Sequence, residues 1–137
     1  VDYAMAQVAA LAPPRGADGD RRTRLEAQVT TRARTCERWL PLWRSLVVNQ
    51  GNSPELKERI KQSRERAMAR LELMYAPELG SLPADERRQM VIALEALTDV
   101  ESWARMREFF GLSFDEACLV WTQAIDRLLP HETSRTP

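Results

Sequence analysis

The residue types that carry most enzymatic chemistry are scarce in this sequence. The single histidine, His131, lies in the polar C-terminal stretch. Cys36 and Cys118 each fall on the apolar stripe of an expected helix, where a free thiol behaves as a small hydrophobe, with a redox switch as the alternative role. The sequence contains no CxxC, HExxH, glycine-rich phosphate loop or nucleophile elbow. We therefore expect a protein that is not an enzyme and that has no cofactor and no metal site.

Paired carboxylates are present, but their positions suit helix capping. Asp85 and Glu86, like Asp115 and Glu116, fall at the starts of expected helices, where acidic side chains complement the helix dipole. A di-metal helical bundle would need inward Glu-x-x-His pairs, which this sequence lacks.

Composition indicates one all-α domain. The chain has 137 residues, of which 44% are hydrophobic and 29% charged, as in soluble globular proteins. It is rich in helix-forming Ala, Leu, Glu and Arg, and it has no run of alternating β-branched residues. No apolar run approaches the roughly 20 residues that span a bilayer, and no signal peptide is visible, so we expect a cytoplasmic protein that does not enter a membrane.

The net charge of zero argues against strong nucleic-acid affinity for the chain as a whole. Basic residues nevertheless outnumber acidic ones between Arg15 and Leu71, and the balance reverses from Glu72 onward. Solvated helix faces with i,i+4 ion pairs account for this distribution, and a functional basic surface is the alternative.

Periodicity and capping signals place the helices. The expected segments are a helix over 1–11, a loop over 12–20, helices over 21–49, 53–76, 83–97, 98–110 and 113–129, and a polar tail over 131–137, with 1–130 forming the domain. Pro41 should kink or break the long second helix, and Gly51 should end it as a left-handed cap. Ser53 is an expected N-cap, and capping boxes are expected at Thr98 and Ser113.

The last two long helices carry more apolar surface than one core contact requires. The final helix has an apolar arc of about 180°, whereas a helix that covers one side of a core needs about 100°. The helix over 83–97 has apolar residues on two opposite faces. A second copy of the chain could cover the excess by forming a four-helix bundle, although each helix could also be central in a monomer. The expected interface residues are Val91, Ile92, Glu95, Phe114, Cys118, Trp121, Thr122, Ile125 and Leu129.

Three segments of the last third resemble one regulator family. The run ALEALTDVESWARMR over 93–107 is followed by GLSFDEA over 111–117 and AIDRLL over 124–129. Together they are similar to the C-terminal end of TetR-family transcriptional regulators, where an ALxALxSxExWxxLR helix pair precedes GLSxEEA and AIxxLL. The family's helix-turn-helix sequence occurs nowhere in these residues. We expect that domain before Val1, with 1–11 as the end of the helix that links the two domains.

The resemblance implies an effector-binding and dimerisation domain of a regulator, most simply a repressor. A small molecule would enter a pocket among the central helices and shift the homodimer away from its DNA-binding shape, and operator DNA would be contacted only through the missing helix-turn-helix domain. The expected pocket residues are large or adaptable side chains, namely Trp39, Trp43, Met68, Leu71, Tyr75, Trp103 and Met106. With few fixed charges among them, they predict a hydrophobic or aromatic effector.

Two other functions fit the sequence. The apolar arcs could dock a different protein, which would make the chain a helical interaction or adaptor module with no small-molecule ligand. The arginines between Arg21 and Arg44 could instead bind nucleic acid.

Overall fold

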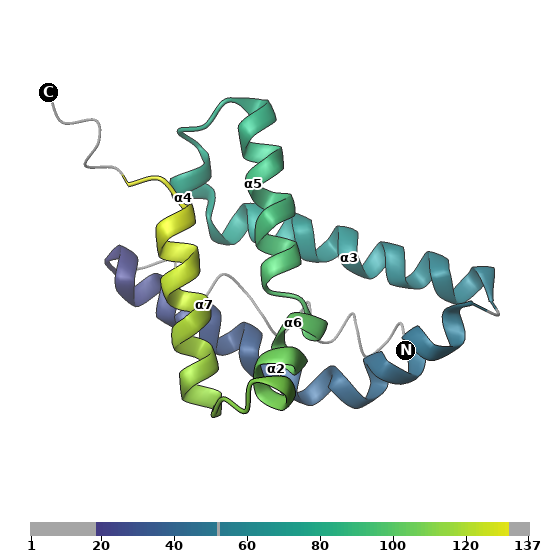
Figure 1. Ribbon diagram of the computed structural model, residues 1–137. Helices are drawn as coiled ribbons and strands as arrows, with labels where there is room; N and C mark the ends of the chain where they lie inside the picture. The colour runs from purple at the N-terminus through teal and green to yellow at the C-terminus, as the bar shows by residue number, and fades with distance from the viewer. Residues whose placement is uncertain (1–18, 52, 132–137) are drawn as a thin grey trace, which may run out of the picture.

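The computed structural model describes residues 19–51 and 53–131, and within these ranges the chain is helical and has no strand (Figure 1). The elements are α2 (Arg21–Gln50), α3 (Pro54–Met74), α4 (Ala76–Leu79), α5 (Ala84–Leu97), α6 (Val100–Ala104), the π-helical turn η1 (Arg105–Phe109) and α7 (Phe114–Leu128). The all-α class is confirmed for this part of the chain. The helix expected over 1–11, most of the loop over 12–20 and the tail from 132 lie outside the described residues.

The long helix α2 begins at Asp20, whose side chain accepts a hydrogen bond from the Thr23 backbone N–H at 2.8 Å. The helix continues through Pro41 to Gln50, so the expected break does not occur. Figure 1 shows α2 changing direction near its middle, as expected where a proline removes one backbone donor. Gly51 has a φ of −62°, so the expected left-handed cap is wrong.

Helix α2 organises the fold because α7, α6 and α3 all pack against it (Figure 1). Its buried stripe of Leu25, Val29, Ala33 and Cys36 has exposed fractions of 0 to 2%. The spacing of these residues by three or four positions places them on one face, where they join the core with apolar residues of α7.

Helices α3 and α5 pack against each other, and the short α4 connects them. Ser53 caps α3 by accepting from the Leu56 backbone N–H, as its sequence predicted, and Pro54 occupies the first turn. Tyr75 and Leu79, at the junction with α4, are 2% and 1% exposed and contribute to the core.

The segment from α6 to α7 is set by two caps and one glycine. Asp99 caps α6 through the Ser102 backbone N–H, so the capping box expected at Thr98 is wrong by one position. The Thr98 hydroxyl instead donates to the Leu94 carbonyl. Gly111 has a φ of +68°, a left-handed conformation that glycine adopts without a Cβ penalty. Ser113 and Glu116 then form the expected capping box of α7.

A buried ion pair ties the start of α2 to α4. The Arg24 guanidinium donates to the Glu78 carboxylate at 2.5 Å, and both side chains are largely buried. Arg21 lies 3.9 Å from the same carboxylate and also binds Asp126 and the carbonyls of Leu129 and Pro130. These contacts fasten the N-terminus of α2 to both α4 and the C-terminus of α7.

We predict that Glu78→Gln lowers the free energy of unfolding by about 3 kcal/mol, because it leaves the Arg24 charge buried without a carboxylate. The exposed Arg22–Glu26 pair supplies the control: Glu26→Gln should cost no more than about 0.5 kcal/mol. Urea unfolding of both variants measures the difference. Equal losses would show that burial adds nothing to the Glu78 contact.

Candidate small-molecule site

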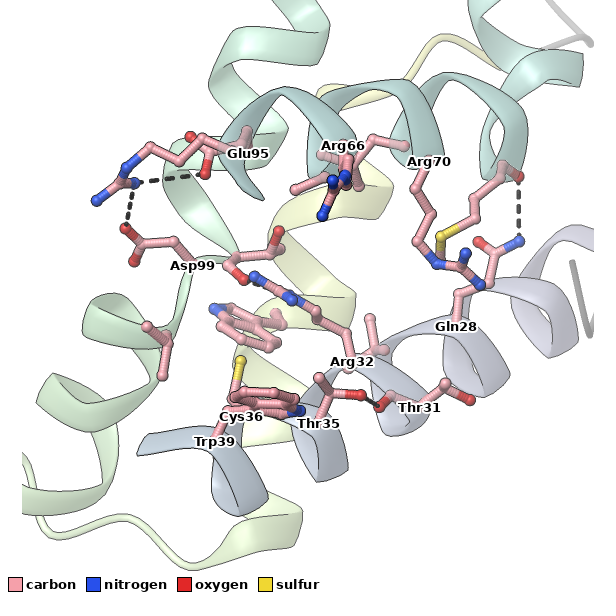
Figure 2. Close-up of a pocket in the computed structure, with 18 of the residues that line it drawn as sticks. Gln28, Thr31, Arg32, Thr35, Cys36, Trp39, Arg66, Arg70, Glu95 and Asp99 are labelled. Carbon is pink, nitrogen blue, oxygen red and sulfur yellow. Dashed lines mark hydrogen bonds and ion pairs between the residues drawn. The ribbon is translucent and has the colours of Figure 1, made fainter. Parts of the chain in front are cut away.

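A cavity of about 190 Å³ lies between α2 and α3 (Figure 2). Side chains of α2 form one wall and side chains of α3 form the opposite wall. Glu95 of α5, the Thr98–Asp99–Val100 junction, and Trp121 and Ile125 of α7 complete the lining. The cavity is therefore built from nearly every long helix of the described chain.

Small residues on α3 leave the space open. Ser63 and Ala67, four positions apart, both line the cavity. Larger residues elsewhere in the core set the spacing between α3 and α2. The short side chains of Ser63 and Ala67 do not reach across that spacing. The gap between the two helices therefore stays unfilled.

The α2 wall and the α7 floor are largely apolar and aromatic. Trp39, Trp43 and Cys36 of α2 line the cavity together with Trp121 of α7. Figure 2 shows the Trp39 indole on the α2 side, beside Thr35 and Cys36. Flat indole faces suit a flat apolar ligand.

Arginine side chains border the same space. Figure 2 shows Arg66 and Arg70 reaching from α3 toward α2, while Arg32 extends from α2 into the gap. The Arg32 Nε donates to the Thr98 carbonyl at 2.8 Å, which fixes the direction of this side chain. Burial and the nearby positive charge of Arg32 lower the pKa of Arg70. The cavity thus brings like charges together in a partly desolvated setting.

A fourth arginine is neutralised by acidic neighbours. Arg64 lies 3.6 Å from Glu95 and 3.5 Å from Asp99, and its guanidinium sits 5.1 Å from the centre of the Trp43 ring. Burial, and then repulsion from Asp99, raises the pKa of Glu95. By contrast, no carboxylate of the described residues lies within ion-pair distance of Arg32 or Arg66.

Three buried polar atoms on the cavity wall have no hydrogen-bond partner among residues 19–51 and 53–131. They are the Gln28 Oε1 and the indole nitrogens of Trp39 and Trp43. Gln28 is 3% exposed and Trp43 is 8% exposed. Most buried polar groups in proteins are hydrogen-bonded to protein or to ordered water, so these two donors and one acceptor are the groups beside the cavity whose partners lie outside the described residues.

The structure separates the seven residues that the sequence assigned to a pocket. Trp39, Trp43, Leu71 and Tyr75 line the cavity, whereas Met68, Trp103 and Met106 do not. Met68 is partly buried against the core and Met106 is buried within it.

Trp103 packs in the core of the chain and does not line the cavity. Its ring lies 5.4 Å from that of Phe114 and 5.0 Å from that of Trp121, and its Nε1 donates to the Glu37 carboxylate. Its size predicted a pocket position, but its contacts place it in the aromatic core between α6 and α7.

Sequence reasoning missed the charged half of the lining. The expectation of few fixed charges is wrong, because Arg32, Arg64, Arg66 and Arg70 all line the cavity. These arginines had been interpreted as part of a solvated basic face. The signal lay in α3, where Arg66 and Arg70 alternate with the small residues Ser63 and Ala67.

Five of the nine expected interface residues are covered by the chain itself. The exposed fractions of Val91, Trp121, Thr122, Ile125 and Leu129 are at most 3%, so residues of the same chain already cover these five side chains.

The other four keep some accessible surface. Ile92 is 47% exposed, and Glu95, Phe114 and Cys118 are partly buried. The apolar surface that α7 exposes lies at Leu119, Val120 and Leu128.

Other chemistry is sparse in the described part of the chain. It contains no group of three or more His, Cys, Asp or Glu side chains placed to hold a metal ion. No helix within residues 19–51 and 53–131 is long and apolar enough to span a membrane. No protein-family model, curated protein or solved structure matches this chain.

We predict that Cys36 resists alkylation in the folded protein. Burial raises the pKa of its thiol to about 11, so only about one molecule in a thousand carries a thiolate at a pH near 8. Iodoacetamide labelling followed by mass spectrometry should modify Cys36 only after urea unfolding, and should modify the less buried Cys118 sooner. Rapid native labelling of Cys36 would show that the wall of the cavity opens freely.

Proposed function

We propose that this chain is the effector-binding and dimerisation domain of a TetR-type transcriptional regulator. The proposal combines the likeness of 93–129 to that family with a helical architecture that encloses a small-molecule cavity. The observation that carries it is the set of orphaned polar atoms at Gln28, Trp39 and Trp43, all on one cavity wall. A domain that only needed stability would pair or exclude such atoms.

The location of the cavity suits a sensor. Its lining draws on α2, α3, α5 and α7, so a ligand bound there contacts helices far apart in sequence. Differential affinity for two arrangements of these helices would shift the population between them. In the proposed regulator, that shift moves the homodimer away from its DNA-binding shape and relieves repression.

Dimerisation would use the apolar positions that α5 and α7 leave exposed. These two helices contact each other, and Figure 1 shows them side by side. Ile92 of α5 is 47% exposed, and Val120 and Leu128 of α7 are 46% and 43% exposed. Two such helices from each copy would form the proposed four-helix bundle.

A second candidate is an adaptor that docks another protein. It is favoured by Phe109 and Phe110, which are 78% and 61% exposed and whose rings pack edge to face at 4.9 Å. Aromatic residues displayed in this way are typical anchors of protein interfaces.

We predict a homodimer that Ile92→Glu and Val120→Glu convert to monomers, because each variant would bury a charge in the interface. Leu73→Glu on α3 is the matched control, since Leu73 is 72% exposed and lies outside the proposed surface. Light scattering coupled to size exclusion gives the mass of each species. A wild-type monomer would contradict dimerisation. If that monomer bound another protein and Phe109→Ser abolished the binding, the result would favour the adaptor.

The ligand-binding half of the proposal has a separate test. A thermal-shift screen of the wild-type chain against a chemically diverse small-molecule library, anionic and neutral compounds included, should yield stabilising ligands by mass action. Trp39→Phe removes one orphaned donor. This variant should therefore bind less tightly those library compounds that quench the tryptophan fluorescence of the wild-type chain. A screen without a single stabilising compound would count against a sensor.

A further inference from the structure

The charges around the cavity define the kind of ligand that it accepts. Arg32, Arg66 and Arg70 reach into one gap from two helices (Figure 2). Arginine presents planar forks of N–H donors that match the oxygen atoms of carboxylates and phosphates. In the described chain, Glu95 and Asp99 lie within ion-pair distance of Arg64, whereas no carboxylate lies that close to Arg32 or Arg66.

The orphaned atoms refine this picture. The indole N–H groups of Trp39 and Trp43 can only donate, so each calls for an acceptor on the ligand. The Gln28 Nε2 donates to the Met74 carbonyl at 3.0 Å, which fixes the amide orientation and leaves Oε1 as an acceptor on the cavity wall. The ligand therefore carries oxygen acceptors and one donor beside its anionic group.

The remaining wall is flat and apolar. Trp39, Trp43 and Trp121 line the cavity with Val29 and Ile125, and together they exclude a ligand that is polar throughout. A cavity of about 190 Å³ accommodates a compact ring system.

We propose that the cavity recognises an aromatic oxyanion, a flat ring that bears a carboxylate or a phosphate. The anionic group lies among Arg32, Arg66 and Arg70, and the ring lies against the tryptophans. This inference rests on the proposed small-molecule function and adds an anionic group to the hydrophobic or aromatic effector expected from sequence. Arg66 is exposed at the rim, whereas Arg32 and Arg70 are partly buried and supply the principal contacts.

The test compares ligands that share one ring and differ in charge. Isothermal titration of the full chain uses 2-naphthoate, 2-naphthyl phosphate and the neutral 2-naphthamide, with 6-hydroxy-2-naphthoate probing the acceptor at Gln28. We expect at least one anion to bind about 10-fold or more tightly than the amide, the magnitude of one charge-assisted hydrogen bond. The relative affinities of naphthoate and naphthyl phosphate identify the preferred oxyanion.

Variants locate the anion. Arg32→Gln and Arg70→Gln should each weaken anion binding about 10-fold or more and leave amide binding nearly unchanged. Arg38→Gln and Lys61→Gln remove equal charges from outward positions of the same two helices and should have little effect. Thermal melts by circular dichroism establish that each variant is folded, and Arg70→Lys reports on the guanidinium fork if Arg70→Gln unfolds.

The outcomes separate this inference from the proposed function. An amide that binds as tightly as the anions, or neutral hits from the library while no anion binds, overturns the oxyanion assignment and leaves small-molecule binding intact. Equal losses of anion affinity in the cavity variants and the outward variants would also overturn it, because the affinity would then depend only on the net charge of the chain. Failure of the anions, the amide and the whole library overturns both.

Discussion

The constraint on which the fold and its cavity both depend is that α2 must pack on two sides at once. Its stripe from Leu25 to Cys36 is buried with α6 and α7, and a second face meets α3. The apolar contact fixes the position of α2, because well-packed cores resist displacement. On the second face, Ser63 and Ala67 are too short to fill the gap, so the same packing that stabilises the domain leaves a cavity beside it.

Electrostatics distinguish two positions in the first half of that helix. At its start, Arg24 is buried against Glu78, and the pair fastens α2 to α4. Further along, Arg32 shares a partly desolvated space with Arg70, and burial together with the Arg32 charge lowers the pKa of Arg70. The first arrangement is what a folded protein needs, whereas the second places like charges together, a cost that functional sites commonly carry.

The sequence predicted those features of the fold that interactions between neighbouring residues control. Ser53 and Ser113 marked helix starts because capping chemistry acts within a single turn. The arc of α7 was recognised as too apolar for solvent, but periodicity cannot distinguish burial by the same chain from burial by another. Trp121 was therefore placed at an interface, although it is 1% exposed inside the chain.

The charged lining of the cavity could not be predicted from interactions between neighbouring residues. An arginine such as Arg70 has the same helical spacing whether it faces water or a cavity, and only the tertiary contact between α2 and α3 distinguishes the two. Pro41 shows what a local rule leaves open, because the missing backbone donor predicted a kink or a break, and α2 changes direction but continues to Gln50 (Figure 1).

The central claim is that the orphaned donors of the cavity wall bind a ligand, and the indole N–H signals of Trp39 and Trp43 report on it directly. In ¹⁵N-resolved spectra of the chain titrated with 6-hydroxy-2-naphthoate, whose hydroxyl supplies an acceptor beside the carboxylate, we predict that at least one of these two signals moves downfield as its hydrogen gains an acceptor. The Trp103 signal should stay in place, because its N–H already donates to Glu37. Signals of Trp39 and Trp43 that remain fixed while the ligand binds elsewhere would contradict the account.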